Sequence, residues 1–214
     1  MADHHSYVAH HFDTAEQQYE ASQLGMWAFL ITEVMFFGGL FGGYAVYRMQ
    51  YPQAFIEGSH HLDITLGAIN TAVLICSSLT MALAVYYSQK GKRNALLTFL
   101  VLTLVLGAVF LGIKAVEYSH KYHDHMIPGP NFHMAGATSS NVEIFYSFYF
   151  AMTGLHALHM IIGIGIILVI MRMAWQNRFS SAYYTPIEIF GLYWHFVDIV
   201  WIFLFPLLYL IGRH

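Results

Sequence analysis

The sequence predicts an all-α, polytopic membrane protein built as a bundle of five transmembrane helices, and three observations lead to this prediction. Of the 214 residues, 57% are hydrophobic and only 10% are charged, whereas a soluble domain of this length needs a larger charged surface. The mean hydropathy is positive, at +0.53. Five apolar segments also reach the length of about 20 residues that a helix needs to cross a hydrocarbon core.

The five spans are expected, in chain order, at residues 24–47, 66–87, 95–116, 144–171 and 187–211. The first three are followed by residues that end helices or mark a membrane edge: Arg48 and Pro52, the basic run 89–93, and the Pro-Gly-Pro sequence 128–130. The last two are identified by their length and apolar composition. Residues 1–22 are expected to form a cytoplasmic tail, and residues 23–214 a single membrane domain.

Charge and cysteine content exclude several classes of protein. The net charge of −3 comes from 9 basic and 12 acidic residues, which are too sparse and too mixed for a nucleic-acid-binding surface. The only cysteine, Cys76, excludes a disulfide framework or a thiolate metal cluster within the chain. The amino terminus lacks the basic start of a secretory signal, so we expect a mature terminus. Its histidines are expected in a solvated tail instead of a metal site: His4, His5, His10 and His11.

The orientation follows from the basic residues. An odd number of spans places the two ends of the chain on opposite sides of the membrane. Five of the nine Lys and Arg residues lie on the side of the amino terminus, and basic residues favour the cytoplasmic side. Lys114 lies about one turn inside its span and is expected to snorkel toward the opposite surface. We therefore expect a cytoplasmic amino terminus and a periplasmic carboxyl terminus.

Glu33 stands near the middle of the first span, where an isolated ionised carboxylate is costly. Two interpretations are open: a protonated carboxyl that hydrogen-bonds to a neighbouring helix, or a group that exchanges protons or contacts a ligand. Two overlapping GxxxG pairs follow it and allow close helix packing, so the first span is expected to pack against protein there. These glycines are Gly38, Gly39, Gly42 and Gly43.

Helical spacing groups further polar residues onto shared faces. His156 and His159 are three residues apart, as are His195 and Asp198, and Glu188 lies two turns before His195. Each pair could serve a ligand, but an ordinary interhelical hydrogen bond is the commoner role of such residues. The sequence Lys114, Glu117, Lys121 most simply forms an ion-pair ladder at a helix end.

Three classes of function remain open from these residues alone. A haem-carrying membrane cytochrome would need two histidines facing one another at similar depth, and His159 with His195 is the nearest candidate pair. A proton or ion carrier would need a chain of exchangeable groups, of which Glu33 is only one. An assembly subunit needs only the packing features already described.

Five motifs, in order, closely resemble subunit III of the haem-copper cytochrome c oxidases. They are LGMWAFLITEVMFF at 24–37, INTAVL with SS at 69–78, GAVFLG with EY at 107–118, TGLHALH at 153–159 and YWHFVDIVW at 193–201. The resemblance covers about residues 23–212. It implies an accessory subunit without catalytic or metal-binding residues, because the haems and coppers of that family belong to subunits I and II.

The resemblance also implies roles for individual residues. In the family, subunit III binds phospholipid, supports proton uptake into subunit I and protects the reaction centre during turnover. Glu33 aligns with the family's carbodiimide-reactive carboxylate, which is held neutral near a lipid-lined cleft that can help oxygen reach subunit I. Arg172 falls near a family arginine that contacts lipid phosphate. His156, His159, Glu188, His195 and Asp198 are then expected to be lipid-contacting or interhelical polar residues.

One departure from the family pattern concerns the number of helices. Many members have seven, and this chain begins where their third does, so the two helices that form one wall of the lipid cleft are not in it. Five-helix forms resemble bacterial versions, which implies a bacterial plasma membrane. A small subunit IV and a respiratory supercomplex are further implied partners. Quinol oxidases and nitric-oxide-reductase-associated proteins share the fold and remain alternatives.

Overall fold

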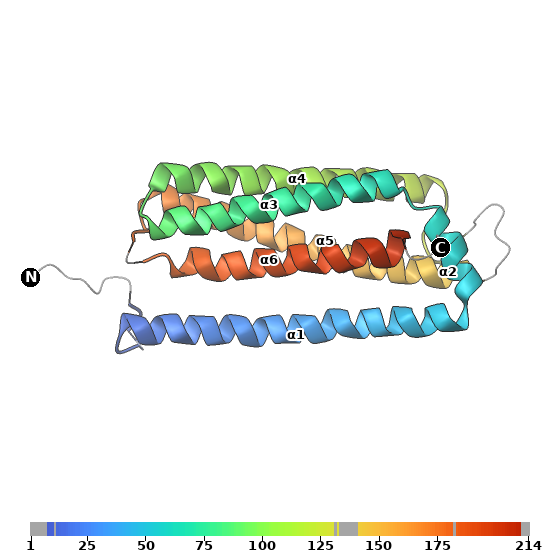
Figure 1. Cartoon of the computed structure of the whole chain (residues 1–214), viewed down its shortest axis with the longest axis horizontal. Coiled ribbons are helices and arrows are strands. Elements are labelled where there is room, and N and C mark those ends of the chain that lie inside the picture. Colours follow the sequence, from blue (N-terminus) through green and yellow to red (C-terminus); the bar gives the residue numbers. More distant parts are fainter. Residues whose placement is uncertain (1–7, 11, 131, 133–140, 182, 211–214) are drawn as a thin grey trace, which may run out of the picture.

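The computed structural model describes residues 8–10, 12–130, 132, 141–181 and 183–210. Over these residues the chain forms helices without strands, and the five-helix membrane bundle is confirmed, because five helical segments are long and apolar enough to cross a membrane. The elements are α1 (Ala15–Gln50), α2 (Pro52–His60), α3 (Ile64–Gln89), α4 (Arg93–His123), α5 (Val142–Trp175), α6 (Thr185–Phe205) and the π-helix η1 (Pro206–Leu210) (Figure 1).

The helices α1 and α4 extend furthest beyond the expected spans, and the short helix α2 was not expected. α1 begins at Ala15 because the Thr14 hydroxyl caps it by accepting a hydrogen bond from Gln17 N at 3.1 Å. α4 continues to His123, beyond the predicted end of its span. Pro52 follows the first span, as expected, and is also the first residue of α2. A proline is favoured there because the first N–H groups of a helix have no partner within the helix. Burial of Phe55 then holds this short helix against the bundle.

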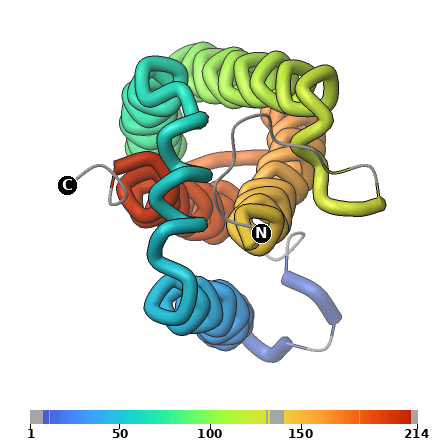
Figure 2. Tube along the Cα trace, turned by 90° about the vertical axis from the view of Figure 1, so that its right-hand side faces the viewer, coloured from blue at the N-terminus to red at the C-terminus, as the bar shows by residue number. Residues whose placement is uncertain are grey.

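The helices α3, α4, α5 and α6 form a ring, and α1 lies outside it against α6 and α5 (Figure 2). Consecutive helices of the ring run in opposite directions (Figure 1). The start of α1 and the end of η1 lie at opposite ends of the molecule, as an odd number of spans demands (Figure 1). α1 has few buried positions, which are Leu30, Phe37 and Tyr44 at heptad spacing. The Tyr44 hydroxyl fixes its far end by donating to Leu207 O at 2.9 Å.

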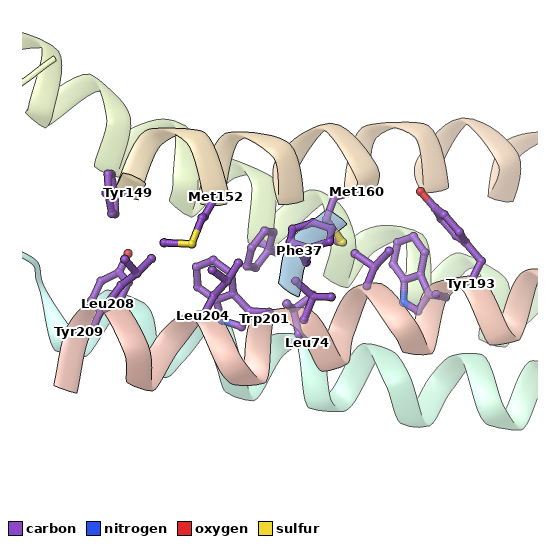
Figure 3. Packing of buried hydrophobic residues seen from close by; sticks show 14 of the residues in the cluster. Phe37, Leu74, Tyr149, Met152, Met160, Tyr193, Trp201, Leu204, Leu208 and Tyr209 are labelled. Atoms are coloured by element: carbon purple, nitrogen blue, oxygen red, sulfur yellow. The ribbon is translucent and has the colours of Figure 1, made fainter. Parts of the chain in front are cut away.

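Two tryptophans of α6 fill the centre of the ring. Trp194 is fully buried and lies where Gly107 of α4 and Gly163 of α5 leave room for its ring. Its indole nitrogen donates to Ser77 of α3 at 3.0 Å. One end of the α5–α6 contact is occupied by Tyr149 and the π-helix, and Figure 3 shows the apolar side chains that continue from there toward Tyr193. The α6 register is thus set by large rings placed against glycines.

The expectation that Lys114 snorkels to the membrane surface is wrong. Its side chain is only 3% exposed, and its ammonium group donates to the Glu117 carboxylate at 2.8 Å and to the Tyr209 hydroxyl at 3.0 Å. Tyr149 and Tyr209 also donate to Glu117. Lys114 also donates to the Tyr149 hydroxyl at 3.3 Å. The Lys114–Glu117 pair therefore lies inside the bundle, where its hydrogen bonds to Tyr149 and Tyr209 connect α4 with α5 and η1.

The predicted ladder at a helix end is also wrong in its third member. Lys121 forms no ion pair with Glu117 within the described residues; its ammonium group donates instead to the backbone oxygen of His61 at 2.5 Å. The sequence spacing identified the first pair correctly but placed it at the end of a helix. α4 continues past Glu117 to His123, and both Lys114 and Glu117 are buried.

Candidate functional site

Glu33 of α1 and His159 of α5 contact one another across the junction between α1 and the ring. The distance from Glu33 Oε2 to His159 Nε2 is 3.1 Å. The two side chains are 18% and 11% exposed, respectively, so the pair is mostly buried but still accessible from one side. The interaction joins positions 126 residues apart in the sequence.

The other ring nitrogen of His159 decides how the pair can hold protons. His159 Nδ1 lies 2.9 Å from Leu155 O, one turn earlier in α5. A carbonyl oxygen can only accept a hydrogen bond, so Nδ1 must carry a proton. Nε2 then either accepts a hydrogen bond from a protonated Glu33 or, in an imidazolium, donates one to a carboxylate. In both forms a single proton is shared between Glu33 and His159, and it can move between them without any movement of a helix.

Aromatic rings hold this imidazole in place. Tyr193 of α6 donates through its hydroxyl to His159 O at 2.9 Å, and its ring lies nearly parallel to the imidazole with 6.4 Å between ring centres. Phe37 of α1 covers another side, with 5.5 Å between ring centres. These contacts come from two helices other than that of His159. The orientation of His159 toward Glu33 is therefore fixed by the packing of α1, α5 and α6.

The pair stands in the wall of an apolar cleft between α1 and the α5–α6 edge. The cleft has a volume of about 650 Å³. Its polar lining comes from Glu33, His159 and Tyr193, and the other lining residues are Met26, Phe29, Ile162, Ile166, Pro186, Ile189 and Phe190. A long, largely apolar cleft of this size suits hydrocarbon chains or a small apolar molecule. Its opening is flanked by exposed Ile162 and Phe29.

His156 does not share the environment of His159, although the two share a helix face. It is fully buried, and neither ring nitrogen has a hydrogen-bond partner within the described residues. Its ring lies between Phe110 and Trp201, at 5.3 and 5.2 Å between ring centres. His156 is therefore part of the central packing of the ring of helices, away from the cleft wall.

His195 and Asp198 lie together on the opposite side of α6, in a groove between α3 and α6. His195 Nδ1 is 2.8 Å from the Ser78 hydroxyl of α3. His159 and His195 thus line different cavities and do not face one another. The described residues also contain no group of three or more metal-binding side chains. His4, His5 and His11 lie outside the described residues.

The two remaining candidate residues lie near one membrane surface. Glu188 is in the first turn of α6, where a carboxylate is favoured by the helix dipole, and it interacts with Tyr19 of α1. Arg172 is in the last turn of α5 and is exposed. Neither contacts the Glu33–His159 pair. Both belong instead to the polar border of the bundle at the end where α1 begins.

Among the described residues, only one glycine of the two GxxxG pairs packs closely against another helix of this chain. A Cβ atom added at Gly43 would lie 3.2 Å from the Phe148 ring of α5. A Cβ atom added at Gly38, Gly39 or Gly42 would meet no atom within 4 Å. Close packing at these three positions stays a prediction, and it would need a partner other than the described residues.

The chain is similar to a known family along almost its whole length. The family described as cytochrome c oxidase subunit III matches residues 2–213. The probable quinol oxidase subunit 3 of Staphylococcus haemolyticus is 31% identical over 94% of each chain. The cytochrome c oxidase subunit 3 of Thermostichus vulcanus is 32% identical over 94% of this chain and 92% of its own. The cytochrome bo(3) ubiquinol oxidase subunit 3 of Pseudomonas aeruginosa is 30% identical over 99% of this chain and 95% of its own.

Proposed function

Because the chain belongs to the subunit III family of haem-copper oxidases and is a multi-pass membrane protein within such an oxidoreductase complex, we propose that it serves as a cofactor-free accessory subunit. Its proposed work is to bind phospholipid, to support proton uptake by subunit I and to prolong the active life of the enzyme. Subunits I and II are the proposed partners and the proposed holders of haem and copper.

The observation that carries this proposal is the Glu33–His159 pair in the wall of the apolar cleft. The cleft offers about 650 Å³ of largely apolar space, which suits phospholipid acyl chains and also oxygen, a small apolar molecule. The pair shares one proton at 3.1 Å and is accessible from the cleft. The proton can move from one member of the pair to the other beside the lipid without changing the net charge of the pair.

Two classes of molecule remain candidates for the electron donor of the complex: a quinol and cytochrome c. Relatives at nearly equal identity carry the names quinol oxidase and cytochrome c oxidase, so both remain candidates for the complex. The proposed location is a bacterial plasma membrane with the amino terminus in the cytoplasm. This orientation rests on the five basic residues on that side against four on the other.

The proposal can be tested by deleting the chain and purifying the oxidase from membranes with and without it. The complete complex should contain this chain together with haem-bearing subunits. The depleted enzyme should start at a similar rate of oxygen consumption but lose activity after fewer turnovers. An oxidase that never contains the chain would contradict the proposal, as would a purified chain that carries stoichiometric haem in a pyridine haemochrome spectrum.

A further inference from the structure

A polar group of three residues lies on the outer seam between α3 and α6, away from the Glu33 cleft. Ser78, His195 and Asp198 line a groove of about 420 Å³ whose other walls are apolar. Ser78 lies near the middle of α3, and His195 and Asp198 lie near the middle of the last span, which runs over Thr185–Leu210. The group is therefore far from both membrane surfaces.

Asp198 is the unusual member of this group. It is only 2% exposed, and neither carboxyl oxygen has a well-aligned hydrogen bond within the described residues. The Ser78 hydroxyl lies near the carboxyl and also contacts His195 at 2.8 Å. A hydroxyl has only one hydrogen to donate, so Ser78 cannot satisfy both carboxyl oxygens. The carboxyl thus retains capacity to accept a hydrogen bond.

The side chains around the groove face outward. Ile75, Leu79 and Ile199 are 54%, 61% and 50% exposed. Contact with lipid is favourable for aliphatic side chains, but a carboxyl without a hydrogen-bond partner at mid-bilayer depth is costly in free energy. Hydrocarbon tails carry no hydrogen-bond donor, and the head group of a phospholipid lies at the membrane surface. A protein segment that reaches the middle of the membrane can supply the donor.

We propose that the α3–α6 groove is the surface on which a transmembrane helix of a partner subunit docks, and that this helix presents a hydrogen-bond donor to Asp198. The proposal rests on the proposed function, since it requires the chain to work within an oxidase complex. The small side chains of Ser78 and Ala82 line the groove and allow a close approach, as is typical of helix contacts in membranes. The donor is a hydroxyl, amide, imidazole or basic side chain.

Photo-cross-linking in the intact complex tests the location. Leu79, at the groove, is replaced by the photoreactive amino acid p-benzoylphenylalanine, and Val105 of α4 serves as the matched control. Val105 is 52% exposed and lies at a similar depth, because Thr80 and Thr103 of the two helices are hydrogen-bonded to one another. Illumination should join position 79, but not position 105, to another polypeptide, which mass spectrometry of the joined peptides identifies.

Two variants of Asp198 test the chemistry. Asp198→Asn keeps an oxygen that accepts a hydrogen bond, whereas Asp198→Leu has none. The ratio of this chain to haem in the purified oxidase should stay near the original in Asp198→Asn. In Asp198→Leu it should fall about three- to twentyfold at a detergent concentration that releases part of the chain, which is the range expected for one hydrogen bond between membrane helices.

The outcomes separate this proposal from the proposed function. Cross-linking of position 79 to lipid alone, or of position 105 alone to protein, overturns the groove assignment while a chain that co-purifies with haem still supports the proposed function. A chain that never co-purifies with haem overturns both. Because the Leu79 variant leaves Asp198 in place, its result decides the matter even if Asp198→Leu prevents the chain from accumulating.

Discussion

Lys114 and Glu117 form a 2.8 Å ion pair inside the bundle, with only 3% and 4% of their side chains exposed. Removing one member of such a pair leaves a buried charge without a partner, which costs about 3–5 kcal/mol, whereas replacing both by apolar residues is often nearly neutral. We therefore expect Lys114→Met alone to destabilise the chain by about this amount and the double variant Lys114→Met, Glu117→Leu to recover most of the loss. The measurement is the midpoint of thermal release of the chain from the purified oxidase. Equal losses in the single and double variants would contradict this expectation.

The second prediction concerns the proton shared by Glu33 and His159. In Glu33→Gln the amide can still donate a hydrogen bond to His159 Nε2, but it can never release a proton. We expect assembly to remain intact and turnover to fall only modestly, whereas Glu33→Ala should loosen the contact between α1 and α5 and shorten the active lifetime. Oxygen consumption over many turnovers and proton release are followed together in reconstituted vesicles. Loss of all pumping in Glu33→Gln at an unchanged rate of electron transfer would make Glu33 an obligatory proton carrier and would refute its supporting role.

The third prediction tests access to the cleft with two neighbouring isoleucines. Ile162 lines the cleft, whereas Ile161 is exposed on the same helix but does not line it. A tryptophan at position 162 should fill part of the cleft, slow the carbodiimide labelling of Glu33 several-fold and reduce the amount of phospholipid that co-purifies. Ile161→Trp adds the same ring facing outward and should leave both quantities unchanged. If both variants lower labelling equally, the cleft does not control access to Glu33.

The fourth prediction concerns the fit between Trp194 and α5. A Cβ atom at Gly163 would lie 2.8 Å from the Trp194 ring, while a Cβ atom at Gly165 would meet nothing within 4 Å. Overpacking of this kind typically costs about 1–3 kcal/mol, and the gain in helix propensity from glycine to alanine is at most about 1 kcal/mol. Gly163→Ala should therefore lower the thermal midpoint of the complex, and Gly165→Ala should leave it unchanged or raise it slightly. A lower midpoint in Gly165→Ala alone would contradict this account.

The number of spans could be predicted from the sequence because membrane crossing depends on the length and polarity of a local segment. α2 could not be predicted in the same way. Its nine residues have no long apolar stretch, and they are held by distant contacts such as that between Phe55 and Phe145, whose ring centres are 5.6 Å apart. The burial of Lys114 could not be predicted either, because its partner Tyr209 lies 95 residues later in the chain.

The residues of the candidate site could be predicted from the sequence, but the contact between them could not. The position of Glu33 within an apolar span marked it as unusual, and the spacing of His156 and His159 placed both on one helix face. Spacing of three residues cannot say which imidazole meets Glu33, since that depends on the rotation of α5. The rotation is fixed by the Trp194 ring against Gly163, a contact between helices that no local pattern reveals.

The 126 residues that separate Glu33 from His159 have a consequence for how the chain is made. α1 is synthesised first, whereas α5 follows only after α3 and α4 are complete. At a synthesis rate of about 5–20 residues per second, roughly 6–25 seconds pass between the synthesis of Glu33 and that of His159. During this interval Glu33 must remain protonated, stay within the insertion machinery or be shielded by another membrane protein. Biogenesis of the complex therefore includes a period in which α1 has been made but lacks its contact with α5.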